Sequence, residues 1–122
     1  MVPLLLTLSG ALELGAGAAL LAAPSLVASL LLGGTLEAPA QVVARVAGAA
    51  LLALGLACWS ARREAPGRGM VTAMLAYNVG AVAVFLHAHF GVGLNGIGLW
   101  PAIILHTGLA GWCVVARRSA AK

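Results

Sequence analysis

The stretch from Pro3 to Ala23, PLLLTLSGALELGAGAALLAA, decides the fold because it has the length and composition of a membrane-spanning helix. Its side chains are almost all apolar, and Glu13 is its only charged residue. A helix needs about 20 apolar residues to cross a hydrocarbon core about 30 Å thick. We therefore predict an all-α protein, a four-transmembrane-helix bundle that forms a single transmembrane domain over residues 1–122. Its helices are expected at residues 3–23, 39–59, 70–90 and 97–116.

The composition of the whole chain excludes several classes of protein. Of its 122 residues, 62% are hydrophobic and 8% are charged. A soluble domain has roughly 45–50% apolar and about 25% charged residues. The chain therefore has too few charges to coat a soluble enzyme or to keep a disordered segment in water. Its formal net charge is +4. The basic residues do not form the basic face with interleaved aromatic residues that nucleic-acid binding requires. We expect a lipid bilayer as its partner and no nucleic acid.

The basic residues predict the orientation of the helices in the membrane. Cytoplasmic loops carry an excess of Lys and Arg. Here these residues gather after the second and fourth apolar stretches, whereas the other two loops have none. We therefore expect both termini in the cytoplasm. The start of the chain also lacks Lys and Arg before its apolar run, so we expect a first helix and no cleaved signal peptide. The topology-setting residues are Arg62, Arg63, Arg68, Arg117, Arg118 and Lys122.

The segment SLVASLLLGG, residues 25–34, is apolar but too short to cross the membrane again. It follows Pro24, which cannot continue a helix without a kink. Two readings stay open: the segment either extends the first helix beyond that kink or forms a short helix in the membrane interface. Pro39 is placed where the next helix should begin.

Each predicted span carries one strongly polar residue near the middle of the membrane. A charged side chain there costs roughly 2.5–3.5 kcal/mol on insertion scales, so it must face protein or water. We predict a polar membrane-interior site from these four residues, with a second set that could line a ligand. The site residues are Glu13, Arg45, Asn78 and His106, and the possible ligand-lining residues are Ser9, Gln41, Tyr77 and His87.

Glu13 and Arg45 both lie on helix faces with small residues, which let helix backbones approach closely. We expect the two side chains to meet as a buried ion pair that holds the bundle together, with Asn78 and His106 completing its hydrogen bonds. The alternative is a small-molecule or proton-coupled site centred on Glu13. The ion pair argues against that alternative, because a guanidinium keeps a neighbouring carboxylate ionised.

No catalytic, metal or cofactor site is evident. The chain has no Asp. Thr7 and Ser9 lie near Glu13 on the first helix, but that helix has no His to activate a hydroxyl nucleophile, so we do not expect an enzyme. His87 and His89 point about 160° apart on a helix and cannot hold one metal. A haem held by His87 and His106 is a second alternative. The two histidines are expected about 5 and 14 Å from the outer edge of the membrane, and this difference in depth argues against their binding one haem. Cys58 and Cys113 are expected to stay as buried free thiols.

Several segments resemble small four-helix bacterial membrane proteins of the DoxX-like kind. These segments are ALELGAGAALLAAPSLV, ARVAGAALLALGLACWSARR, LAYNVGAVAV and LWPAIILHTGLAGWC. The resemblance implies the fold and a bacterial inner (plasma) membrane, and it implies no single activity. We therefore expect a non-enzymatic accessory or structural subunit of a larger membrane complex, or a homo-oligomer. A transporter or ligand-binding protein that uses the polar layer is the alternative.

Small multidrug-resistance exporters are also similar, since they are four-helix chains of this length with one essential Glu where Glu13 falls. The sequence departs from their pattern, because it lacks their cationic residue later in the first helix and their Tyr and Trp positions in the other helices. An Arg45 beside Glu13 would also compete with a cationic substrate for the carboxylate.

Overall fold

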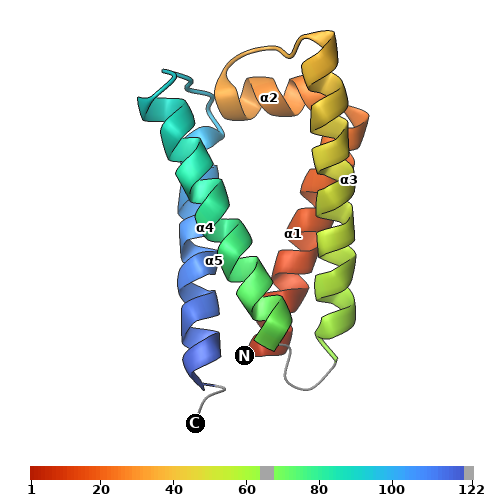
Figure 1. Cartoon of the computed structure of the whole chain (residues 1–122), viewed down its shortest axis with the longest axis vertical. Coiled ribbons are helices and arrows are strands. Elements are labelled where there is room, and N and C mark those ends of the chain that lie inside the picture. The colour runs from red at the N-terminus through yellow and green to blue at the C-terminus, as the bar shows by residue number, and fades with distance from the viewer. Residues whose placement is uncertain (64–67, 120–122) are drawn as a thin grey trace.

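The computed structural model describes residues 1–63 and 68–119, and within these ranges the chain forms five helices (Figure 1). Four of them are long and apolar enough to cross a membrane, which confirms the predicted all-α architecture. Their ends lie within three residues of the predicted ones. Lys122, one of the predicted topology-setting residues, lies outside the described residues. The helices are α1 (Val2–Ala22), α2 (Pro24–Leu32), α3 (Ala38–Ala61), α4 (Arg68–Phe90) and α5 (Leu99–Ser119).

The four long helices form two antiparallel pairs, α1 with α3 and α4 with α5. Each pair is in contact along its length, whereas contacts between the pairs are sparse. Figure 1 shows that the pairs approach each other at the end where both chain termini lie, and separate toward the end where α2 lies across them. We call these the terminal end and the α2 end. Which end faces the cytoplasm stays a prediction from the basic residues.

Glycines bring the backbones of α1 and α3 together. A Cβ atom added to Gly10 would lie 3.1 Å from the carbonyl oxygen of Gly55, and one added to Gly17 would lie 2.6 Å from that of Gly48. The two glycines of each helix are seven residues apart, so they fall on one face at two levels. We call this contact the α1–α3 seam. Its existence bears out the expectation that small residues let these backbones approach.

The core that joins the pairs lies at the terminal end. All four long helices contribute to it, so this is where the two pairs are held against each other. Cys58 and Cys113 are completely buried there, as free thiols. Leu5 and Leu6 of α1 pack in the same core, with residues of α4 and α5. The buried members of the core are Leu5, Leu6, Cys58, Val71, Met74, Leu109, Cys113 and Ala116.

The segment after α1 is a separate helix, which decides between the two readings of residues 25–34. The backbone leaves helical geometry at Ala23, with φ −141° and ψ 63°, and α2 starts at Pro24. It ends at Gly33 in a left-handed conformation with φ 77°, which glycine adopts without steric cost. Hydrogen bonds from the amides of the α4–α5 loop then tie it to the other pair, as Asn95 N–H donates to Leu32 O (3.2 Å) and Gly98 N–H to Leu30 O (2.8 Å).

Candidate functional site

Glu13 lies on α1 between Gly10 and Gly17, at the edge of the seam that faces Tyr77 of α4. It is 2% exposed, and the side chain of Tyr77 on α4 is the polar group that interacts with its carboxyl group. A tyrosine hydroxyl can donate to a carboxylate, but it brings no positive charge. The acidic group at the middle of α1 is thus buried beside a neutral partner.

The expected ion pair between Glu13 and Arg45 is not formed, and this prediction was wrong. Arg45 is exposed, and its Nε donates to the backbone oxygen of Leu21 at the end of α1 (3.1 Å). The reason is the register of the seam. Because Gly17 faces Gly48, Arg45 lies level with the last turn of α1, about seven residues or roughly 10 Å along the helix from Glu13.

The two side chains also lie on opposite edges of the seam. Glu13 points to the α4 side, where it meets Tyr77, whereas Arg45 remains at the outer surface of the α1–α3 pair. Sharing a face with small residues therefore placed both groups near the seam without placing them together. In the part of the chain that the structure describes, no ion pair neutralises Glu13.

Asn78 and His106 bond to each other, and they do not complete the hydrogen bonds of a Glu13–Arg45 ion pair as we had expected. The Asn78 amide is fully buried, and its Nδ2 donates to Met74 O (2.7 Å) while its Oδ1 lies 2.7 Å from His106 Nδ1. Since an amide oxygen only accepts, Nδ1 of His106 must carry the proton. In the neutral ring this leaves Nε2 as a hydrogen-bond acceptor.

Tyr77 joins this pair to Glu13. Its ring makes an edge-on contact with the ring of His106, with centroids 5.6 Å apart and planes at 80°. The ring of Phe85 also contacts this histidine at a tilt, with the centroids 5.8 Å apart. The polar layer therefore runs from Glu13 on α1 through Tyr77 to His106 and Asn78, and it connects three helices across the gap between the two pairs.

The four expected ligand-lining residues divide into two groups. Tyr77 and Ser9 lie in the region of the polar layer. Ser9 is completely buried one turn from Glu13, and its hydroxyl has no hydrogen-bond partner among the described residues. Gln41 instead donates to Leu36 O (3.1 Å) near the α2 end, and His87 is exposed close to the end of α4.

An apolar cleft opens between α3 and α4, and Tyr77 is part of its wall. Its volume is about 500 Å³. The lining is formed mainly by alanines, with larger side chains from Leu51, Val84 and Phe85. The cleft could not be predicted from the sequence, because an alanine or glycine on an apolar helix can equally face lipid or pack against another helix. The lining residues are Ala47, Ala50, Leu51, Ala76, Tyr77, Gly80, Ala81, Val84 and Phe85.

The remaining histidine belongs to an aromatic group at the α2 end. His89 Nδ1 lies 3.3 Å from Leu94 O, and its ring contacts those of Phe90 and Trp100 with centroids 4.7 and 5.2 Å apart. Within the described ranges, no three His, Cys, Asp or Glu side chains come together as a metal-binding group. The haem alternative for His87 and His106 stays a prediction.

Comparisons with protein-family models, with curated proteins and with solved structures find no match to this chain. The function must therefore be argued from the geometry just described. Chemically, that geometry offers a buried acidic group that has no cationic partner among the described residues, and a tyrosine beside it that also lines an open cleft together with Phe85.

Proposed function

We propose that this protein binds lipophilic organic cations from the membrane, in exchange for a proton on Glu13, and thereby acts as a small proton-coupled transporter. The observation that carries this proposal is the position of the Glu13 carboxyl group. It is buried, it lacks a cationic partner among the described residues, and it interacts with the side chain of Tyr77, which lines the cleft.

A buried carboxylate without a counter-ion supports a cationic ligand. Burying a charge is costly unless the charge is paired, so the site is neutral either when Glu13 is protonated or when a cation has replaced the proton. Arg45, which would have competed for the carboxylate, lies roughly 10 Å along the helix and at the surface. The main objection to a cationic substrate is thereby removed.

The walls of the cleft suit the rest of such a ligand. The faces of Tyr77 and Phe85 can attract a cation, an effect of about 0.5–2 kcal/mol that grows as water is excluded. The alanines and Leu51 provide an apolar surface for lipophilic groups. A volume of about 500 Å³ is within the usual range of small-molecule sites. The accessory-subunit role stays a prediction, and no contact described above favours it.

The first experiment measures the binding of radiolabelled tetraphenylphosphonium to the purified protein in nanodiscs by equilibrium dialysis. We expect Glu13→Gln to weaken binding at least about tenfold, or about 1.4 kcal/mol, because it removes the only negative charge at the site. The matched control is Glu37→Gln, since Glu37 is exposed at the start of α3. Affinity should also rise with pH in the wild-type protein, because protons and the cation compete for one carboxylate. Equal binding by wild type and Glu13→Gln would refute the proposal.

A second variant tests the cleft without touching the carboxylate. A Cβ added at Gly80 meets no atom within 4 Å, so Gly80→Leu fits without a clash but fills part of the cleft. Gly108 on α5 is equally unobstructed and does not line the cleft. We expect Gly80→Leu to reduce tetraphenylphosphonium binding at least about fivefold, or about 1 kcal/mol, and Gly108→Leu to leave it unchanged. If both leucines have the same effect, the ligand does not occupy this cleft.

Transport is tested with the same variants in proteoliposomes. An imposed pH gradient should drive uptake of the labelled cation by the wild-type protein and not by Glu13→Gln. Binding without gradient-driven uptake would reduce the proposal to a binding protein.

A further inference from the structure

Arg45 is a charged side chain on a membrane-spanning helix that the proposed function leaves unused. It lies near the start of α3 and is exposed. Its neighbours on the same side of α3, Val42 and Ala49, are exposed and apolar, as the lipid-facing surface of a spanning helix should be. A guanidinium on such a surface is costly unless it reaches polar groups. Its charge therefore needs a polar partner.

The end of α1 holds this guanidinium by one hydrogen bond. Arg45 Nε donates to Leu21 O (3.1 Å), and α1 ends at the next residue, Ala22. Carbonyl groups in the last turn of a helix lack donors within the helix and carry a partial negative charge, and Pro24 has no N–H to offer them. Arg45 is thus fixed at the level where the chain leaves α1 and enters α2, which lies across the helix pairs (Figure 1).

The rest of the guanidinium has no partner within the protein. The bond to Leu21 uses only the N–H on Nε. The N–H groups on Nη1 and Nη2 have no hydrogen-bond partner among the described residues, and no carboxylate there forms an ion pair with Arg45. A helix end offers about half an elementary charge, so it cannot balance a full one. A net positive charge therefore remains at the junction of α1 and α2.

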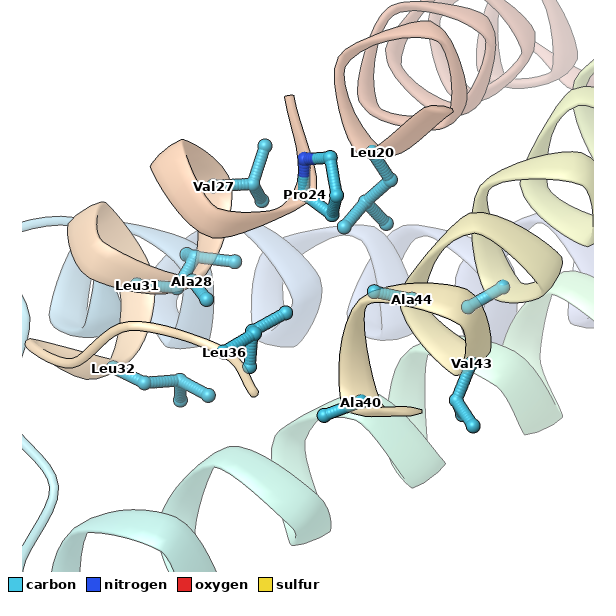
Figure 2. A pocket seen from close by; sticks show the side chains of 11 residues that line it. Leu20, Pro24, Val27, Ala28, Leu31, Leu32, Leu36, Ala40, Val43 and Ala44 are labelled. Atoms are coloured by element: carbon cyan, nitrogen blue, oxygen red, sulfur yellow. The ribbon is translucent and has the colours of Figure 1, made fainter. Parts of the chain in front are cut away.

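An apolar cavity beneath α2 lies on the other side of the α1–α3 seam and does not receive this charge. Its volume is about 280 Å³, and every residue of its wall is apolar. Figure 2 shows Leu20 and Ala44 in that wall. Arg45 does not line the cavity, because one step along a helix turns the side chain by about 100°. Its guanidinium therefore faces out of the helix pair, toward the lipid at the α2 end.

We propose that Arg45 and the end of α1 form a binding site for the phosphate group of an anionic phospholipid in the leaflet at the α2 end. The free N–H groups of a guanidinium match two oxygens of a phosphate, which lysine cannot do. The bond from Nε to Leu21 O holds the side chain in place before the lipid binds, so less freedom is lost on binding. A headgroup with a net negative charge neutralises the remaining positive charge, whereas a zwitterionic headgroup carries its own cation.

The consequence is a preference for anionic over zwitterionic lipid at the junction of α1 and α2. One basic residue near a membrane surface favours an anionic lipid by about fivefold in affinity. The acyl chains add nothing to this preference, because either lipid has the same chain contacts in the surrounding bilayer. The site also lies apart from Glu13, on the opposite edge of the seam, so it is independent of the proposed function.

The test uses the full chain in phosphatidylcholine nanodiscs that contain one of two photoreactive lipids. The two probes have identical acyl chains with a diazirine near the glycerol, and they differ only in their headgroup, phosphatidylglycerol or phosphatidylcholine. After illumination, peptide mass spectrometry measures the adducts in residues 18–25 and 41–49, which flank the junction. We expect the phosphatidylglycerol probe to label these residues about fivefold more than the phosphatidylcholine probe. Adducts at the terminal end, where other arginines lie, are measured in the same samples.

Arg45→Gln should bring the ratio of the two probes at the junction close to one and leave the ratio at the terminal end unchanged. The matched control is Arg118→Gln, which removes an exposed arginine from the last turn of α5 and should leave the junction ratio unchanged. Glu13→Gln should also leave it unchanged, so a failure of the proposed function would not alter this result. Equal junction ratios in wild type and Arg45→Gln would overturn the lipid site.

A second variant keeps the proposal testable if Arg45→Gln does not fold. Arg45→Lys retains the charge but loses both the bond from Nε and the paired N–H groups, so its junction ratio should lie between one and the wild-type value. A junction ratio for Arg45→Lys equal to that of the wild type would overturn the bidentate phosphate site.

Discussion

The two helix pairs use the same kind of residue in different ways. In the α1–α3 pair, Gly17 and Gly48 face each other so closely that no side chain fits between them. In the α4–α5 pair, a Cβ added to Gly80 or Gly108 would meet no atom within 4 Å. One pair is therefore closed by backbone contact, whereas the other leaves space beside it. The backbones of α1 and α3 are therefore in contact, whereas α4 has open space beside Gly80.

The polar groups follow the same division. The α4–α5 pair is joined by the bond between Asn78 and His106, and Tyr77 extends that network to Glu13 across the gap. In a bilayer there is no hydrophobic force to bring apolar helices together, so close packing and interhelical hydrogen bonds do so. The facing glycines pack the first pair, which also has the bond from Arg45 to Leu21 O, and the second pair combines packing in the core with the bond between Asn78 and His106.

The largest effect is expected from filling the seam with Gly17→Leu. A Cβ at this position would lie 2.6 Å from Gly48 O and 2.8 Å from Leu52 N, so α1 and α3 must separate. We expect a loss of about 3 kcal/mol or more in the free energy of unfolding. Buried Cys58 and Cys113 provide the measurement, since the rate of maleimide labelling in detergent should rise as the core opens. Gly15→Leu is the control, because nothing lies within 4 Å of a Cβ there. Equal labelling rates for Gly17→Leu and Gly15→Leu would contradict the claim that close packing at Gly17 holds α1 against α3.

An intermediate effect is expected from Asn78→Ala, which removes the bond between α4 and α5. His106 then loses its partner, and the buried amide leaves a small void, so we expect a loss of about 1–2 kcal/mol. Thermal unfolding followed by circular dichroism measures it. Thr107→Ala is the control on the next residue of α5, since Thr107 bonds only within its own helix, to Ile103 O, and should change stability by less than about 0.5 kcal/mol. If Thr107→Ala is as destabilising as Asn78→Ala, the interhelical bond carries no special weight.

The smallest effect is expected from Arg45→Gln. Arg45 is exposed and bonds only a backbone oxygen, so stability should change by less than about 0.5 kcal/mol. Tetraphenylphosphonium binding should be unchanged, because the guanidinium does not neutralise Glu13. A marked loss of stability that Glu13→Gln reverses would instead restore the ion pair and exclude the site as described.

The fold could be predicted from sequence because hydropathy and helix length are local properties. PLLLTLSGALELGAGAALLAA spans the membrane whatever its neighbours are, and Pro24 breaks the helix wherever it stands. The proximity of Asn78 and His106 could also be predicted from the sequence, because the two polar residues lie at similar depths on consecutive antiparallel helices. The separation of Glu13 from Arg45 could not be predicted in this way. A depth counted from the predicted helix ends does not include how far α1 and α3 are shifted and rotated relative to each other.

The sequence by itself determined that this chain forms four membrane-length helices and which few polar residues they bury. These properties depend on the transfer of each segment from water to lipid, which is nearly additive over residues. Only the tertiary structure decided which polar residues meet. The facing glycines set the register of α1 on α3, which placed Glu13 beside Tyr77 and left Arg45 at the surface. Contact between helices depends on shape at both surfaces at once, and no single segment carries that information.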